Sequence, residues 1–197
     1  MTTAIDTSLP ETRPHILVAG LGNSILQDDG IGVHAALTLV DDLPPGVVAA
    51  EVGTAVLDAL HLFEWADFVL TIDAMEAGGH PGDIYLLDAR QVAGGAVQTS
   101  LHELGLKATL RFAQTPVTHQ VVMIGVEPER IDYSLELTPA LQEALPRVVA
   151  LARRVVEYWR GGGDAGVSSL EEIVELAEGV PLKAHLTATK GIDSCLV

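Results

Sequence analysis

Two neighbouring acids, Asp28 and Asp29, have the residue type and the position that site chemistry needs. They follow an apolar run at 16–19, which is typical of a buried parallel strand, and a glycine-marked turn at 20–23. After them, from Ile31 onward, the apolar spacing becomes that of a helix. The acids are therefore expected above the carboxyl end of a strand and beside a helix amino terminus. Open α/β sheets usually bind their ligands there.

A third acid and an imidazole join this region if the first and third predicted strands are neighbours. Asp73 ends the strand predicted at 68–73, and His102 lies at the head of a later predicted helix. Together Asp29, Asp73 and His102 would offer two oxygen ligands and one nitrogen ligand, which suits a borderline divalent ion such as nickel or zinc. Alternatively, Asp29 and Asp73 as a carboxylate pair could activate water for hydrolysis.

Each of these residues also has a purely structural interpretation. An acid near a helix start often caps that helix or interacts with its dipole, and Asp28 is the one we assign to that role. An acid that ends a strand, as Asp73 does, often forms a turn. A single histidine near a helix start is usually solvated or hydrogen-bonded. Only the expected convergence of Asp29, Asp73 and His102 favours a site.

Composition restricts the class of protein. The chain has 197 residues, 48% of them hydrophobic, and a formal net charge of −16. Such acidity argues against nucleic-acid and membrane partners, because both carry negative charge. The single cysteine, Cys195, excludes a disulfide framework. The first residues lack the features of a secretory signal, so the expected location is cytoplasmic.

The order of predicted elements indicates an α/β protein, a three-layer α/β/α sandwich with a five-stranded sheet. The fourth strand follows the third without room for a crossover helix, so it is expected to be antiparallel and to lie at an edge. One domain is expected at 15–160, with a loose leader at 1–14 and a flexible linker and tail at 161–197. The predicted strands are 15–20, 47–52, 68–73, 83–88 and 120–126, and the predicted helices are 31–42, 56–65, one that opens at 100, and 139–160.

The glycine turn also permits a dinucleotide-binding interpretation. Gly20 and Gly22 fit the first two positions of a G-x-G-x-x-G fingerprint, and Glu51 lies near the place of a ribose-binding acid. However, Ile25 occupies the third glycine position, and acids follow where a pyrophosphate would need bare amides. We therefore regard a nucleotide as the weaker alternative.

Four segments in order resemble the hydrogenase maturation endopeptidases: GLGNSILQDDGIGVHAA, FVLTIDAMEAGGHPGDIYLL, SLHELGL and VVMIGVEPERIDYSLELTP. The resemblance covers about 15–160. It implies a protease that cuts a carboxyl-terminal extension from the large-subunit precursor of nickel-iron hydrogenase after nickel insertion. It also implies a mixed five-stranded sheet with an antiparallel fourth strand.

The resemblance further implies roles for individual residues. The family's two metal-contacting acids fall on Asp29 and Asp73, and its histidine falls on His102. Asp29 and Asp73 would also be the catalytic acids of an aspartic-type peptidase, which uses no nucleotide. Nickel would arrive with the precursor, and another divalent metal could take its place. The loops at 53–54 and 74–81 would line the peptide groove, and the scissile bond would lie beside the carboxylates of Asp29 and Asp73. A non-catalytic nickel checkpoint or chaperone with the same three residues remains an alternative.

Overall fold

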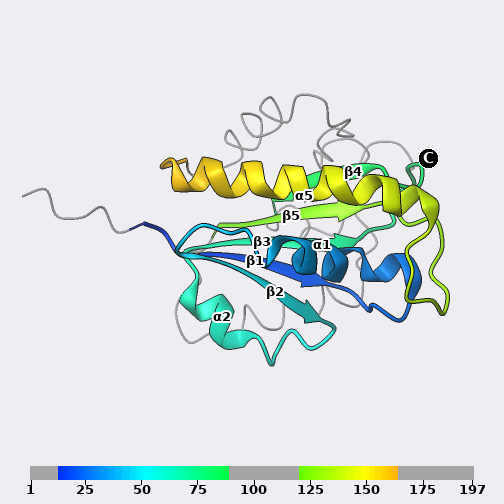
Figure 1. The fold of residues 1–197 in the computed structure, drawn as a ribbon, viewed down its shortest axis with the longest axis horizontal. Coiled ribbons are helices and arrows are strands. Elements are labelled where there is room, and N and C mark those ends of the chain that lie inside the picture. Colours follow the sequence, from blue (N-terminus) through cyan, green and yellow to red (C-terminus); the bar gives the residue numbers. More distant parts are fainter. Residues whose placement is uncertain (1–12, 89–119, 164–197) are drawn as a thin grey trace, which may run out of the picture.

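The computed structural model describes residues 13–88 and 120–163, which form a five-stranded sheet with helices on both faces (Figure 1). The strands are β1 Ile16–Leu21, β2 Val47–Gly53, β3 Phe68–Ala74, β4 Ile84–Asp88 and β5 Gln120–Val126. The helices are α1 Ile31–Leu39, α2 Leu60–Trp65 and α5 Pro139–Arg160, and a single 3-10 turn, η1 Gln27–Gly30, precedes α1.

The strand order places β1, which leads into the loop that carries Asp29, beside β3, which contains Asp73. In the sheet the order is β2-β1-β3-β5-β4, so β1 and β3 are hydrogen-bonded neighbours and both run parallel. The carboxyl ends of β1 and β3 therefore meet at one edge, as the site hypothesis requires. β4 pairs antiparallel with β5 at the margin of the sheet. The predicted mixed sheet and the predicted antiparallel edge strand are both confirmed.

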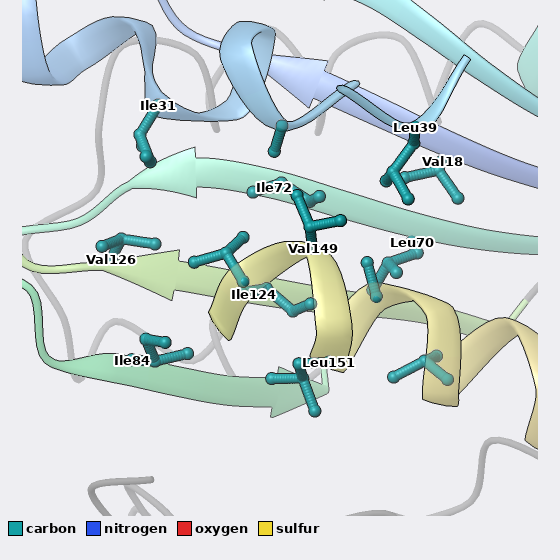
Figure 2. Packing of buried hydrophobic residues seen from close by; sticks show 14 of the residues in the cluster. Val18, Ile31, Leu39, Leu70, Ile72, Ile84, Ile124, Val126, Val149 and Leu151 are labelled. Atoms are coloured by element: carbon teal, nitrogen blue, oxygen red, sulfur yellow. The ribbon is translucent and has the colours of Figure 1, made fainter. Parts of the chain in front are cut away.

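Side chains alternate between the two faces of the strands and bury each face against a different layer. One face carries Val18, Ile72 and Ile124, which pack against α1 and α5 (Figure 2). On the opposite face, Leu17 belongs to the cluster that includes Phe63 of α2. The predicted α/β/α arrangement of three layers is thus confirmed.

Two glycines let α1 lie directly on the sheet. A Cβ atom on Gly20 would lie 2.2 Å from the carbonyl oxygen of Gly32, and one on Gly32 would lie 2.0 Å from the carbonyl oxygen of Ile72. Any larger residue would push α1 away from β1 and β3. Close packing of helix on strand therefore accounts for Gly20, which the dinucleotide interpretation had assigned to a cofactor turn.

Several boundaries differ from those predicted. The first helix ends at Leu39, three residues before the predicted 42. The second begins at Leu60 instead of 56, because 57–59 form turns. The helix predicted to open at 100, the leader before residue 13 and the tail after 163 lie outside the described residues. Within 13–88 and 120–163, no helix is both long and apolar enough to cross a membrane.

The close contact of α1 with the sheet predicts that Gly32→Ala destabilises the fold. The added Cβ meets backbone atoms of Ile72 and Leu21, which cannot move aside as a flexible side chain can. We expect the free energy of unfolding to fall by about 1–3 kcal/mol, measured by urea denaturation. Leu37→Ala, on the exposed side of α1, is the control and should change it by less than about 0.5 kcal/mol. An unchanged midpoint for Gly32→Ala would contradict the packing described here.

Candidate active site

Asp29 is held in a tight loop that closes on itself between β1 and α1. It lies in η1, and its Oδ2 atom accepts a 2.8 Å hydrogen bond from the backbone N–H of Asn23. The N–H of Leu26 donates to the carbonyl of Asn23 at 2.9 Å, and the N–H of Asp29 donates to the carbonyl of Leu26 at 3.2 Å. These bonds fix the Asp29 carboxylate against the turn that follows β1.

Asp73 reaches the same edge from the neighbouring strand. It is the penultimate residue of β3, it is fully buried, and its Oδ1 accepts a 2.9 Å hydrogen bond from the N–H of Ala74. Because side chains alternate along a strand, Asp73 shares a face with Thr71 and Val69, on the α2 side of the sheet.

Gly22 lies between the two acids. A Cβ atom at this position would lie 1.8 Å from the carbonyl oxygen of Asp29 and 3.5 Å from Oδ1 of Asp73. Its φ of +106° also favours glycine. Gly53, at the end of β2, approaches from the other side, since its own Cβ would lie 3.5 Å from the Gly22 carbonyl oxygen. Asp29 and the carboxylate of Asp73 therefore both lie beside the turn 22–23.

The third predicted ligand, His102, lies outside the described residues, so its position relative to the two acids stays a prediction. Within 13–88 and 120–163 no group of three histidine, cysteine, aspartate or glutamate residues is arranged to hold a metal ion. Asp29 and Asp73 are the two described members of the expected set of three, and their role as metal ligands stays a prediction.

Asp28, the neighbour of Asp29, has a structural role that differs from the predicted one. It is fully buried, and instead of capping its own helix it joins η1 to the connection between β5 and α5. Its Oδ1 accepts from the N–H of Thr138 at 2.8 Å, and its Oδ2 accepts from the Thr138 hydroxyl at 2.9 Å. The N–H groups of Glu129 and Arg130 donate to Oδ2 at 2.9 and 3.0 Å.

Another buried acid with a structural role is Glu127, which was not singled out from the sequence. Its carboxylate accepts hydrogen bonds from the N–H groups of Ala77 at 2.9 Å and Gly78 at 3.1 Å, and from the Tyr85 hydroxyl at 2.8 Å. Burial, and then the hydrogen bond to Glu127 and its charge, raise the pKa of Tyr85, so the phenol stays protonated and donates. Glu127 thereby fixes the loop that follows Asp73. Its main partners are backbone amides, which no sequence motif marks.

The fold is that of an α/β protein with a mixed sheet, and the candidate site lies at the carboxyl edge of that sheet. Residues 34–155 match the family model described as hydrogenase maturation protease. A hydrogenase expression/formation protein, HoxM from Cupriavidus necator, is 30% identical over 153 residues, which are 74% of this chain and 76% of HoxM. HupD from Bradyrhizobium diazoefficiens, also a hydrogenase expression/formation protein, is 30% identical over 91% of this chain and 93% of HupD. The chain belongs to the hydrogenase maturation protease family.

A solved structure agrees with this assignment. The hydrogenase maturating endopeptidase HybD from E. coli is 30% identical, and the match covers 72% of this chain and 93% of HybD with a TM-score of 0.60. The α/β fold of this family, predicted from the resemblance, is therefore confirmed.

The contrast between the adjacent acids yields a prediction. Asp28→Asn places an amide NH2 group against backbone N–H donors, so we expect a loss of about 2–4 kcal/mol in the free energy of unfolding. In Asp29→Asn the amide oxygen can still accept from Asn23, so the loss should stay below about 1 kcal/mol. Urea denaturation of both variants measures the difference. Equal losses would show that Asp28 is not the structural member of the pair.

Proposed function

We propose that this protein is the endopeptidase that removes the carboxyl-terminal extension of a nickel-iron hydrogenase large-subunit precursor after nickel has been inserted. In this proposal Asp29, Asp73 and His102 recognise the nickel carried by the precursor. The observation that supports it is that two acids lie beside Gly22: Asp29 in the loop after β1, and Asp73 near the end of β3, the parallel neighbour of β1. The names of the relatives support the reaction, since HybD is called a hydrogenase maturating endopeptidase.

Charge explains how such a site would distinguish loaded from empty precursor. Asp29 and Asp73 are both buried, and two carboxylates in a poorly solvated place repel each other unless a cation offsets them. A precursor that carries nickel supplies that cation, whereas an empty one brings only peptide. The imidazole of His102 would add a nitrogen ligand suited to the same ion. Nickel is therefore part of the substrate, and its presence licenses binding at the two carboxylates.

The same carboxylates would carry out the hydrolysis. With the scissile bond beside them, one carboxylate accepts a proton from water as the water oxygen attacks the peptide carbonyl carbon. The proton then passes to the departing amine as the C–N bond breaks. The loops that line the groove in this proposal, 53–54 and 74–81, begin where β2 and β3 end, at Gly53 beside Gly22 and directly after Asp73.

Mass spectrometry of the precursor tests this function. We expect the purified protein to shorten a nickel-loaded large-subunit precursor by one carboxyl-terminal peptide and to leave the nickel-free precursor intact. Asp29→Ala, Asp73→Ala and His102→Ala should each lower the processing rate at least about 100-fold, because each removes a group that contacts metal or water. Asp41→Ala, an exposed acid after α1, is the control and should process at the wild-type rate.

Two outcomes would contradict the proposal. Equal cleavage of loaded and nickel-free precursor would eliminate recognition of the metal. A stable complex with intact precursor and no released peptide would instead identify a non-catalytic nickel checkpoint, the alternative that uses the same three residues.

A further inference from the structure

Exposed apolar side chains gather beside the candidate active site. Across residues 13–88 and 120–163, most of the large apolar side chains that face solvent lie on two connections at the carboxyl edge of the sheet. We call these four the apolar rim: Ile25 (50% exposed), Ile131 (47%), Tyr133 (84%) and Leu135 (69%). Ile25 belongs to the loop that carries Asp29, and the other three belong to the connection between β5 and α5 (Figure 1).

The two connections are fastened together, so the rim is one surface. The N–H of Gln27 donates to the carbonyl of Ser134 at 2.9 Å, and the N–H of Ser134 donates to the carbonyl of Ile25 at 3.1 Å. These bonds make a parallel bridge between Leu26 and Ser134. Ile25 is next to one residue of the bridge, and Tyr133 and Leu135 flank the other. The bridge therefore brings these three exposed residues close together.

Hydrogen bonds also hold the backbone of the second connection in place, so its apolar side chains stay exposed. Asp28 fixes the start of the second connection through the N–H groups of Glu129 and Arg130, and the Nε of Arg130 donates to the side chain of Gln27 at 3.1 Å. Exposed apolar surface of this kind costs free energy that burial against a partner would recover.

The rim continues from the site. Ile25 is two residues beyond Asn23, whose N–H binds the Asp29 carboxylate. A folded polypeptide that presents a scissile bond to Asp29 would therefore lie close to this surface.

We infer that the apolar rim is the docking surface for the folded body of the hydrogenase large-subunit precursor; this inference rests on the proposed function. A tyrosine exposed among aliphatic side chains matches the composition of protein–protein interfaces, in which tyrosine is enriched. Exposed acids, Glu129, Asp132 and Glu136, alternate with the rim residues along the second connection. The complementary face of the precursor is an apolar patch bordered by lysine or arginine.

Charge favours the precursor over a second copy of this chain as the partner of the rim. The protein has a formal net charge of −16, so two copies brought together at an acid-bordered rim would repel each other. The rim is separate from the carboxylate pair, so it contributes affinity for the precursor whether or not nickel is present. The metal site then decides whether cleavage follows.

A matched pair of double variants tests this assignment. The rim variant, Tyr133→Ser with Leu135→Ser, removes the two most exposed rim side chains. The control variant, Leu37→Ser with Leu57→Ser, removes two leucines that are also exposed, 53% and 56%, but lie outside the two connections. Processing of nickel-loaded precursor should show KM raised about tenfold or more by the rim variant, with kcat within twofold of wild type. The control variant should match wild type in both constants. Ile25→Ser, on the other connection, should raise KM in the same direction.

Binding of nickel-free precursor, measured by titration calorimetry, separates this proposal from the proposed function. Wild-type protein should bind it, and the rim variant should bind at least about tenfold more weakly. Equal binding by wild type and rim variant overturns the rim as the docking surface, even if processing is observed. A wild type that sediments as a dimer and becomes monomeric in the rim variant assigns the rim to a second copy and also overturns it. Wild type that neither binds nor cleaves a precursor overturns the proposed function itself.

Discussion

The buried carboxylate of Asp28 is the interaction on which the arrangement of the site depends. Removing such a group from water is costly, and the cost is offset here by donors from Glu129, Arg130 and Thr138. The donors belong to the connection between β5 and α5, while Asp28 belongs to the loop after β1. One side chain therefore fixes two connections that are far apart in the sequence, since its partners lie 101 to 110 residues after Asp28.

Two consequences follow at the carboxyl edge of the sheet. The loop 22–30 is held closed, so Asp29 stays beside the turn 22–23, which the Asp73 carboxylate also approaches. The second connection is held against the first, so Ser134 bonds on both sides of Leu26. The two adjacent acids have different partners, since Asp28 binds the second connection and Asp29 binds the turn after β1. The structural carboxylate of Asp28 thus holds the loop that carries Asp29.

The sequence was sufficient wherever a local pattern carried the information. Apolar runs marked the strands, and 120–126 was predicted with the bounds that β5 has. The short distance from Asp73 to the next strand was enough to predict that β4 is antiparallel, because no crossover helix fits. The strand order that the site hypothesis requires, β1 beside β3, is present, and Asp29 and Asp73 both lie beside the turn 22–23, while their shared role in a site stays a prediction.

Long-range partners were beyond the reach of those patterns. The hydrogen bonds of Asp28 reach residues more than 100 positions away. The local pattern predicted instead that Asp28 caps its helix or interacts with the helix dipole. Glu127 binds the backbone N–H groups of Ala77 and Gly78. Every residue except proline carries such a group, so the sequence does not mark these two as partners. The single turn at 27–30 is too short to show periodicity. His102 lies outside the described residues, so the metal-binding set of three remains a prediction.

Nickel K-edge X-ray absorption tests most directly whether these two acids recognise the metal of the precursor. The nickel-loaded precursor, with its cleavage junction substituted so that it cannot be cut, would be measured alone, with the wild-type protein, and with an Asp29→Asn, Asp73→Asn double variant. Binding of the wild-type protein should add oxygen and nitrogen neighbours to the nickel, and binding of the double variant, which keeps His102, should add fewer. A nickel spectrum unchanged by bound wild-type protein would contradict recognition of the metal by Asp29 and Asp73.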